Sequence, residues 1–508
     1  MWPRYKKNDF LNISYYLGTL LLFLGAIMLI PLVVSLFFHE FETSAHYLVG
    51  VGVALALGAA LRLTSLSPGG LERKEAMAVV GSMWIITVLI GAIPLWLSGH
   101  FSSYLDALFE SVSGFTATGL SLILDIDHLS MADQMWRFTM HFLGGQGVIV
   151  VALSMGVFAR TGTSFMSAEA REEEVLPFVK RTAQFIWRFS AVVTLVGTLV
   201  VSVITLILGM EPLRAFFHAL WFTIGSYDTG GFAPQSLSLM YYHSWPMEFV
   251  CMILMCMGAI NFAIYARLWQ GRWRTVLRDF LRDIELKTLV IWTVAILVLF
   301  TGTLIAGGIF NDLGTLVRRG VFTIVSASTN TGYQLFSTEQ INTLFTSGAF
   351  MILILSLAIG GSIGSTAGGI KALRVGLVAK AVVARTRSLL SPSSIQDNTS
   401  YYHNGRRLLD NEAVNGAMLI TLLFILSYVL GTVAGVVAGY DALSAVLESV
   451  SVASNAGLSS GISTAAAPWG LKVIYIVQML LGRLEFFTIL TLLAGLLGSL
   501  DPRRWRRA

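Results

Sequence analysis

Apolar runs long enough to cross a lipid bilayer recur along the whole chain. The first extends from Tyr15 to Phe38, and an α-helix needs only about 20 apolar residues to span the hydrocarbon core. Hydrocarbon offers the backbone no hydrogen-bond partners, so a long run must form a helix that satisfies its own peptide groups. Charged residues make up 12% of the chain, against about 25% in soluble domains. The sequence therefore predicts an all-α polytopic membrane protein, with room for about ten spans.

Lysine and arginine are concentrated in alternate loops between these runs. The positive-inside rule assigns such loops to the cytoplasm, which predicts that both termini are cytoplasmic. The net charge of +5 then reflects topology, and no nucleic-acid partner is expected. The basic loops and the C-terminal tail contain Arg4, Lys6, Lys7, Arg62, Arg73, Lys74, Arg160, Arg171, Lys180, Arg181, Arg272, Arg274, Arg278, Arg282, Lys287, Lys371, Arg374, Lys380, Arg385, Arg387, Arg503, Arg504, Arg506 and Arg507. The intervening loops are expected to form an acidic outer face with Asp125, Asp127, Asp133, Glu211, Asp228, Glu339 and Asp441.

Four similar units follow a pair of N-terminal helices. Each unit has an apolar helix, a shorter half-apolar stretch and a second long apolar helix. The short stretches cannot span, and irregular backbone within a membrane is tolerated only where it lines a cavity or is buried in protein. They cover residues 104–121, 213–234, 315–334 and 441–459. This organisation divides the chain into a helix pair (1–75) and four units (76–184, 185–287, 288–407 and 408–508).

The units are recognisable as repeats in their residues. Unit one contains ALFESVSGFTATGLS (Ala107–Ser121), and unit four contains AVLESVSVASNAGLS (Ala445–Ser459), which matches it without a gap. A glycine stands at the corresponding place in each unit, and the four are 112, 101 and 125 residues apart. This period is too long for a solenoid and suits a two-helix pore unit that is used four times. The glycines are Gly119, Gly231, Gly332 and Gly457.

Short segments of Thr, Asn, Ala and Gly at these places are suited to holding a cation. A cation in a pore must exchange its hydration shell for fixed oxygens, which rings of backbone carbonyls supply. Directing successive carbonyls to one side needs unusual backbone angles that glycine adopts at low cost. A short helix before each segment would point its negative C-terminal end at the ion. Residues 107–113, 219–225, 320–326 and 445–451 are predicted to be these pore helices.

At these motifs the chain resembles the Trk/Ktr/HKT superfamily of potassium transporters, and most closely its bacterial TrkH-type membrane subunit. The repeat motifs that carry the resemblance are TATGLS (Thr116–Ser121), DTGGF (Asp228–Phe232), TNTGYQ (Thr329–Gln334) and SNAGLS (Ser454–Ser459). Longer matches are FLGGQGVIVVA (Phe142–Ala152), GAINFAIYARLWQGR (Gly258–Arg272), GGSIGSTAGGIKALR (Gly360–Arg374) and LLGRLEFFTIL (Leu480–Leu490). Together they extend over most of the chain.

The resemblance implies a specific architecture and function. It implies four M1–P–M2 pore repeats around one ion path, two extra N-terminal transmembrane helices and K⁺ uptake across a bacterial inner membrane. It further implies a homodimer in membrane lipid and a cytosolic nucleotide-binding regulatory ring of the TrkA/KtrA type. Nucleotide is expected only on that partner, with no covalent cofactor and no enzymatic activity. The residues implied to bind K⁺ are Ala117, Thr118, Gly119, Thr229, Gly230, Gly231, Asn330, Thr331, Gly332, Asn455, Ala456 and Gly457.

Two departures from the commonest strings of this family stand out. Asp228 places an acid beside the second filter segment, and Gln146 replaces the more usual methionine. Glycine at all four filter positions nevertheless implies a preference for K⁺.

A glycine-rich segment interrupts what should be the second helix of unit three. Glycine within a helix costs about 1 kcal/mol relative to alanine, so GGSIGSTAGG does not favour a continuous helix. The resemblance makes it an intramembrane gating loop; close helix packing through small residues is the alternative. It is no phosphate-binding loop, because Ile370 stands where that motif needs lysine. Its glycines are Gly360, Gly361, Gly364, Gly368 and Gly369.

Arg483 interrupts the apolar run of the last helix, close to Glu485. Ionisable groups within a membrane are costly and usually face a cavity or one another. The resemblance places Arg483 beside the ion path as an electrostatic barrier, and a structural ion pair is the alternative. Residues i and i+2 of a helix do not face each other, so any partner should lie on another helix. In the long cytoplasmic stretch 391–409, at the end of unit three, Asn404-Gly405 predicts a small hairpin on the cytoplasmic surface or a bare surface turn.

Two other classes of function were compared with a cation pore. A coupled secondary transporter (K⁺/H⁺ or K⁺/Na⁺ symport, or transport of an organic solute) also uses repeats and broken helices, but usually two inverted repeats. An intramembrane enzyme would need paired acids or a nucleophile–base pair, and His100, His141 and His218 are isolated in the sequence. The two cysteines, Cys251 and Cys256, lie within one apolar segment and form no disulfide framework.

Overall fold

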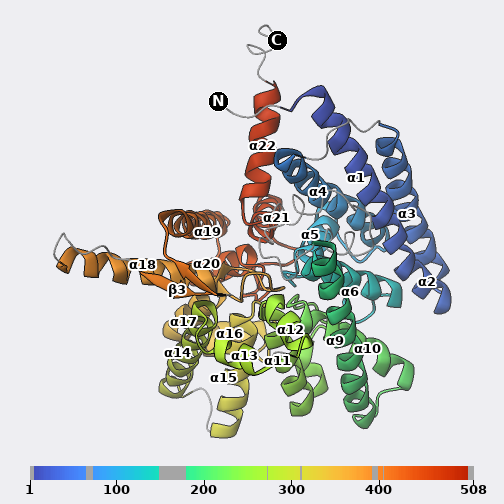
Figure 1. The fold of residues 1–508 in the computed structure, drawn as a ribbon. Coiled ribbons are helices and arrows are strands. Elements are labelled where there is room, and N and C mark those ends of the chain that lie inside the picture. Colours follow the sequence, from blue (N-terminus) through green and yellow to red (C-terminus); the bar gives the residue numbers. More distant parts are fainter. Residues whose placement is uncertain are drawn as a thin grey trace.

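The computed structural model describes residues 5–64, 72–147, 179–271, 273–308, 312–391, 399–403 and 405–500, and helices dominate it (Figure 1). Within these residues six helical stretches are long and apolar enough to span a membrane. Two sharply bent helix pairs raise the number to eight if each pair counts as one span. The predicted class, an all-α polytopic membrane protein, is confirmed.

The N-terminal helices form a pair beside the four units. The first helix is interrupted at Met28, which separates α1 (Lys7–Ile27) from α2 (Leu29–Phe37), and α3 (Phe41–Arg62) returns along it. A β-carbon on Gly18 of α1 would lie 2.7 Å from the carbonyl oxygen of Gly58 on α3. Small residues thus allow the two backbones to approach closely, as in many membrane helix pairs.

Each of the four units contains a long helix, a short helix that ends inside the molecule, and a second helix that is interrupted in units two, three and four. The long first helices are α4 (Arg73–Leu97), α9 (Val179–Ile207), α14 (Ile284–Ala306) and α19 (Asn411–Val437). The short helices are α5 (Tyr104–Phe115), α10 (Pro212–Tyr227), α15 (Leu313–Ser328) and α20 (Ala442–Ala453). The second helices are α6 (Met131–Gln146), α11 (Trp245–Ala259) with α12 (Phe262–Trp269), α17 (Ser347–Ala358) with α18 (Ala372–Leu390), and α21 (Trp469–Arg483) with α22 (Phe487–Leu500). The connections contain η1 (Ser238–Tyr242), α13 (Trp273–Phe280) and α16 (Thr338–Leu344).

The four predicted pore helices are present, each inside one of the short helices. Their starts are set by local chemistry. Ser103, Asp312 and Asp441 accept backbone N–H groups at the first turns of α5, α15 and α20, and α10 begins with Pro212. Such caps satisfy N–H groups that have no partner within the helix.

The second helix is interrupted in units two, three and four, although the sequence predicted this only for the third. Helix α6 ends at Gln146, and Gly147 follows it with a φ of 82°. The chain turns by 96° between α11 and α12 and by 109° between α21 and α22. The second of these turns holds Glu485 and Phe486 at positive φ. In unit three a loop of residues 359–371 separates α17 from α18.

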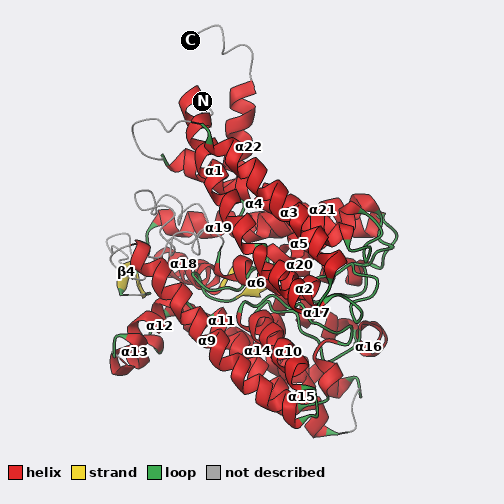
Figure 2. Cartoon of the chain, turned by 90° about the vertical axis from the view of Figure 1, so that its right-hand side faces the viewer, coloured by secondary structure: helices red, strands yellow, loops and turns green. Residues whose placement is uncertain are grey.

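Within the part of the chain that the structure describes, two short sheets accompany these helices. In the loop of unit three, β1 (Ile359–Gly360) pairs in parallel with β2 (Ile370–Lys371). The hairpin predicted at the end of this unit is present as antiparallel β3 (Ser400–Tyr402) and β4 (Arg406–Leu408), while Asn404 of its turn lies outside the described residues. Figure 2 shows β4 at the same end of the molecule as α12 and α13, with α16 at the opposite end.

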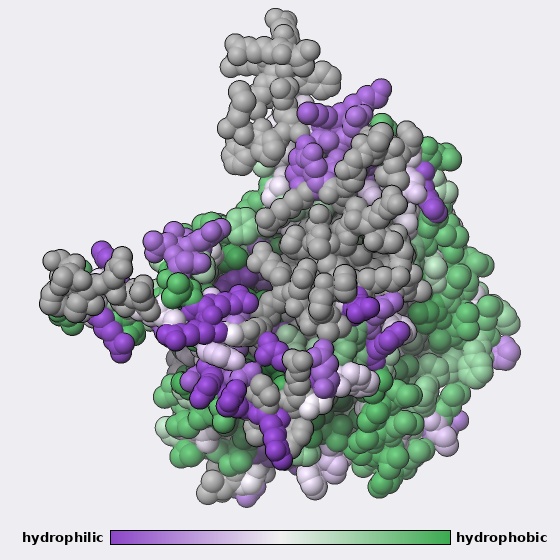
Figure 3. Space-filling view, in the orientation of Figure 1, coloured by the Kyte–Doolittle hydropathy of each residue, from purple (hydrophilic) through white to green (hydrophobic). Residues whose placement is uncertain are grey.

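The surface agrees with a membrane environment. Apolar side chains such as Leu195, Val298 and Leu430 are exposed on α9, α14 and α19. In Figure 3 apolar residues cover the flank formed by α2, α3, α9 and α10, and hydrophilic residues gather around α13, α18 and β3. Lipid in place of water explains why such helices expose their apolar faces.

Two of the acids expected on the outer face are not there. Asp133 and Asp228 are 1% and 0% exposed, because each lies at the end of a helix that packs inside the molecule. Asp125, Asp127, Glu211, Glu339 and Asp441 are exposed as expected. Several predicted basic positions lie outside the described residues: Arg4, Arg160, Arg171, Arg272, Arg503, Arg504, Arg506 and Arg507.

Candidate ion pathway

The four predicted filter segments share one backbone shape. The residue two places before the glycine is left-handed in every unit, with φ of 54° at Ala117, 49° at Thr229, 53° at Asn330 and 52° at Asn455. The glycines follow with φ of 89°, 76°, 86° and 73°. A left-handed residue other than glycine costs roughly 1–2 kcal/mol. Because a left-handed residue stands at the same position in all four units, the surrounding structure must stabilise this backbone conformation.

Hydrogen bonds to the short helices hold the left-handed turns. The N–H of Thr118 donates to the carbonyl of Ser113 at 2.8 Å. The corresponding bonds join Gly230 to Gly225, Thr331 to Ser326 and Ala456 to Ser451, each at 2.9 Å. This is the pattern that closes helix C-termini through a left-handed residue. It reverses the chain at the end of each pore helix and fixes the filter segment to it.

The four glycines form a closed ring with backbone carbonyls. A β-carbon on Gly119 would collide with the carbonyl oxygen of Gly230 in the next unit. The same collision would occur between Gly231 and the oxygen of Thr331, between Gly332 and that of Ala456, and between Gly457 and that of Thr118. The fourth unit thus returns to the first. Eight of the twelve predicted filter residues therefore adjoin one another in this ring, the four glycines and the four residues whose carbonyls they meet. Carbonyl oxygens gathered in such a ring can replace a cation's hydration shell.

Side chains of the filter segments are bonded to the scaffold. The amide of Asn330 donates to the carbonyl of Leu357 at 2.9 Å. The amide of Asn455 donates to Thr118 Oγ1 at 2.9 Å and to the carbonyl of Met479 at 3.0 Å. These residues position the backbone that carries the oxygens.

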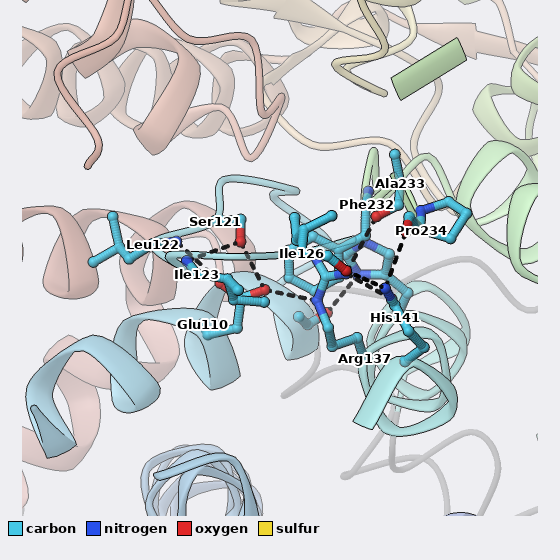
Figure 4. Close-up of polar contacts among 12 residues, drawn as sticks. Glu110, Ser121, Leu122, Ile123, Ile126, Arg137, His141, Phe232, Ala233 and Pro234 are labelled. Carbon is cyan, nitrogen blue, oxygen red and sulfur yellow. Dashed lines mark hydrogen bonds and ion pairs between the residues drawn. The ribbon is translucent and has the colours of Figure 1, made fainter. Parts of the chain in front are cut away.

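A buried ion pair behind the first filter segment was missed by the sequence analysis (Figure 4). Glu110 of α5 and Arg137 of α6 are both 0% exposed, and Arg137 Nε donates to Glu110 Oε1 at 2.8 Å. Glu110 also accepts bonds from Ser121 Oγ at 3.1 Å and from the N–H of Leu122 at 3.2 Å. The carboxylate therefore fastens the chain leaving the filter to its own pore helix.

Glu448 performs the same task in unit four. It accepts bonds from Ser459 Oγ and from the N–H groups of Ser460 and Ser463, at 2.8–3.1 Å. Both glutamates stand in the string ESVS, which units one and four share. An acid repeated within an apolar helix was the signal that could have identified them.

Arg137 and His141 connect the first filter segment to the second. Arg137 Nη1 donates to the carbonyl of Ala233 at 3.2 Å, and its guanidinium lies 4.2 Å from the centre of the Phe232 ring. His141 Nε2 accepts the N–H of Phe232 at 3.0 Å, so its Nδ1 carries the proton donated to the carbonyl of Gly114. The His141 and Phe232 rings stack at 4.1 Å. The histidine that looked isolated in the sequence thus bridges two units.

The glycine-rich loop of unit three packs directly against the filter segments. A β-carbon on Gly360 would collide with Asn330 Oδ1, and one on Gly368 with the carbonyl of Ser454. Thr366 Oγ1 donates to the carbonyl of Gly258 at 2.9 Å and contacts Thr229 Oγ1 at 3.2 Å. Gly364 and Gly369 have positive φ values of 67° and 68°, which favour glycine. Gly361 lies against the carbonyl of Ala259, at 2.6 Å from a built β-carbon.

Arg483 lies between this loop and unit one. Its guanidinium donates to the carbonyl of Thr366 at 2.9 Å, to that of Gly145 at 3.2 Å and to that of Gly144. Glu485, the partner considered for it, forms its ion pair with Arg374 of α18. Loop and arginine border a cavity of about 40 Å³ whose lining includes Gly368, Gly369, Lys371, Gly482 and Arg483. A polar cavity of this size can hold ordered water.

Gln146 and Asp228, the two residues that differ from the usual strings of the family, contact each other. Gln146 Nε2 donates to Asp228 Oδ1 at 2.7 Å, and Gln146 Oε1 accepts Ser190 Oγ at 2.7 Å. Asp228 caps the end of α10 directly before the second filter segment. The acid is therefore buried beside the ring, at the inner end of a pore helix.

Comparison with known proteins identifies the family. Residues 46–500 match the family model TrkH, described as a cation transport protein. The chain is 29% identical to an uncharacterised cation transporter of Methanocaldococcus jannaschii, with 97% of each chain covered. It is 27% identical to the Trk system potassium uptake protein TrkH of Halomonas elongata, with 97% of this chain and 98% of the relative covered.

A solved structure shows the same fold. The crystal structure of the potassium transporter TrkH from Vibrio parahaemolyticus matches with a TM-score of 0.79 at 23% identity, covering 99% of this chain and all of the other. The four-repeat pore architecture with two N-terminal helices is thus shared with a TrkH protein. Members of this family transport cations and are not enzymes. The chain belongs to the TrkH family of cation transport proteins.

Proposed function

We propose that this protein mediates K⁺ uptake through a filter formed by the four glycine-containing segments. The proposal rests on the closed ring in which each glycine faces a carbonyl oxygen of the next unit. Relatives that align over nearly the whole chain carry the name potassium uptake protein, which supports K⁺ as the ion. Glycines at all four positions leave space for carbonyl oxygens and no room for side chains.

The proposal extends to the gate and the partner. The loop with Gly360, Gly361, Gly364, Gly368 and Gly369 occludes the path below the filter, and Arg483 adds an electrostatic barrier. A homodimer in the inner membrane works with a cytosolic nucleotide-binding ring of the TrkA type, and both termini face that ring. Support for the gate comes from the contacts of the loop with Asn330 and Ser454, and the partner is inferred from family resemblance alone.

Uptake of radiolabelled rubidium by cells lacking their own K⁺ uptake systems tests the function. Cells that express the protein should accumulate rubidium and grow at low K⁺. Excess K⁺ should compete, whereas excess Na⁺ should not. Expression in the membrane without rubidium uptake above the empty-vector level would contradict K⁺ transport.

Coupled symport with H⁺ or Na⁺ is the second candidate function. The observation that favours it is Asp228, a buried carboxylate held by Gln146 next to the filter. Buried acids within membranes are typical of coupling-ion sites. In proteoliposomes, a reversal potential that follows only the K⁺ gradient supports a channel, whereas one that also follows H⁺ or Na⁺ supports symport.

Replacing Arg483 with glutamine is expected to increase flux. A guanidinium stays protonated at physiological pH and repels a passing K⁺. With an effective dielectric constant of about 20 and a separation of about 7 Å, the repulsion is about 2 kcal/mol. Its removal should raise K⁺ flux per folded protein by up to about thirtyfold.

The matched control is Arg385→Gln, which removes an exposed arginine from α18. Arg483→Gln with unchanged flux and a large loss of thermal stability would instead identify Arg483 as a structural residue that ties the loop to α6.

A further inference from the structure

We propose that Asp283, Glu285 and His403 form a binding site for one divalent metal ion of the zinc class. Asp283 and Glu285 stand at the start of α14, and His403 follows β3 in the hairpin. One ligand atom from each lies within 4.8 Å of the others. The side chains of His403 and Asp283 are 2% and 13% exposed, and Glu285 is 2% exposed. Two segments distant in sequence therefore bring nitrogen and oxygen ligands together in a sheltered place.

The distances within the group suit a metal ion. His403 Nδ1 lies 3.2 Å from Asp283 Oδ1 and 3.1 Å from Oδ2. Charge-assisted N–H···O bonds are usually about 2.7–2.9 Å long. Ligands about 2.0–2.1 Å from a tetrahedral zinc ion stand roughly 3.3 Å apart. The imidazole and the Asp283 carboxylate are thus spaced like two ligands of one ion, and an oxygen of Glu285 lies within 4.8 Å of both.

Hydrogen bonds from the backbone orient both carboxylates. Asp283 Oδ1 accepts the N–H of Glu285 at 2.8 Å, and Glu285 Oε1 accepts the N–H of Ile363 at 2.6 Å. The backbone N–H of His403 donates to the carbonyl of Gly405 at 2.8 Å and so fixes the main chain of the hairpin at this residue. Fixed outer partners of this kind are typical of metal ligands.

Charge and ligand type narrow the class of ion. Two sheltered carboxylates repel each other, and a divalent ion would offset both charges while leaving the imidazole neutral. The positive charge of the Lys371 ammonium also attracts Glu285, and a protonated His403 would form an ion pair with Asp283. Both cations therefore compete with a metal ion for the carboxylates. One nitrogen and two oxygens suit Zn²⁺ or Mn²⁺, whereas Mg²⁺ and Ca²⁺ prefer oxygen alone. Three protein ligands leave a fourth position for water.

The site would connect the hairpin to the loop below the filter. Ile363 belongs to the glycine-rich loop, and Glu285 holds its N–H. A bound ion would fix the hairpin, the start of α14 and this part of the loop to one another. An effect of metal on K⁺ flux rests on the proposed function, whereas binding of the metal does not.

Metal titration of the purified, tag-free full chain tests the proposal. After removal of metal with EDTA, Zn²⁺ is titrated in competition with a chromogenic chelator, and Co²⁺ binding is followed by its visible absorption. We expect one Zn²⁺ per chain in the wild type. Asp283→Asn and His403→Gln should each weaken binding at least tenfold and reduce the Co²⁺ absorption. The control is His128→Gln, which changes an exposed histidine paired with Asp125 and should leave binding unchanged.

Folding and function are monitored separately. Zn²⁺ should raise the thermal unfolding temperature of the wild type and the His128→Gln variant, but not that of the other two. No saturable Zn²⁺ binding in the wild type would overturn the proposal. So would equal Zn²⁺ affinity in all four proteins with lower stability of His403→Gln, because His403 and Asp283 would then form only an ion pair. Binding as expected in a protein that takes up no rubidium would contradict the proposed function and leave the metal site standing.

Discussion

Substituting serine for Gly119 is expected to reduce the K⁺/Na⁺ permeability ratio at least tenfold while the protein still folds. The new β-carbon would overlap the carbonyl oxygen of Gly230, and φ of 89° is strained for serine. The carbonyl must turn away, and the oxygens would no longer stand at the spacing that replaces the hydration shell of K⁺. The ratio is measured from reversal potentials in proteoliposomes with K⁺ on one side and Na⁺ on the other. Gly332→Ser should give the same result at the opposite side of the ring.

Gly470→Ser is the matched control. Gly470 lies in α21, and no atom would come within 4 Å of a β-carbon there. Its permeability ratio should equal that of the wild type. Unchanged ratios in folded Gly119→Ser and Gly332→Ser proteins would rule out these glycines as part of a filter.

Replacing Glu110 with glutamine is expected to lower the folding stability of the protein more than any other single substitution described above. Glu110 and Arg137 are both fully buried, so the change leaves the guanidinium without its counter-charge. Breaking a buried ion pair at one partner costs about 3–5 kcal/mol. The expected result is a marked drop in thermal unfolding temperature and in the yield of monodisperse protein. The measurement is a thermal unfolding scan in detergent.

The double variant Glu110→Gln with Arg137→Gln separates charge from packing. It should be more stable than Glu110→Gln alone, because no isolated charge remains buried. Glu339→Gln, at an exposed acid in α16, should unfold like the wild type. A double variant no more stable than the single one would show that the hydrogen bonds to Ser121 and Leu122 matter and the ion pair does not.

The parts that sequence predicted are those determined within one segment. The pore helices and the four glycines could be recognised because length, apolar character and the need for positive φ are local properties. The hairpin was likewise predicted from Asn404-Gly405, two adjacent residues. The gating role of the loop stays a prediction, although Gly364 and Gly369 do adopt the angles that favour glycine.

The parts that were missed depend on residues distant in sequence. Arg137 reaches Glu110 across 27 residues, Gln146 reaches Asp228 across 82, and Arg483 reaches Gly144 across 339. The sequence indicated that Asp228 was unusual, but not that Gln146 faces it. The bend between α11 and α12 was also missed, because it contains no glycine run. Its one local signal is Asn261, whose side chain accepts the N–H of Ala263 at the start of α12.

Four units in one chain free the pore from strict symmetry. In a pore assembled from four identical subunits, every mutation appears four times, and a buried acid beside the filter would bring four repelling charges. Here the left-handed position is alanine, threonine or asparagine according to the unit, and Asp228 stands beside only the second. Gene duplication within a chain therefore lets selection change the charge around the ion in one repeat without changing the other three. Each repeat can drift on its own, except at the glycine that must accommodate its neighbour's carbonyl.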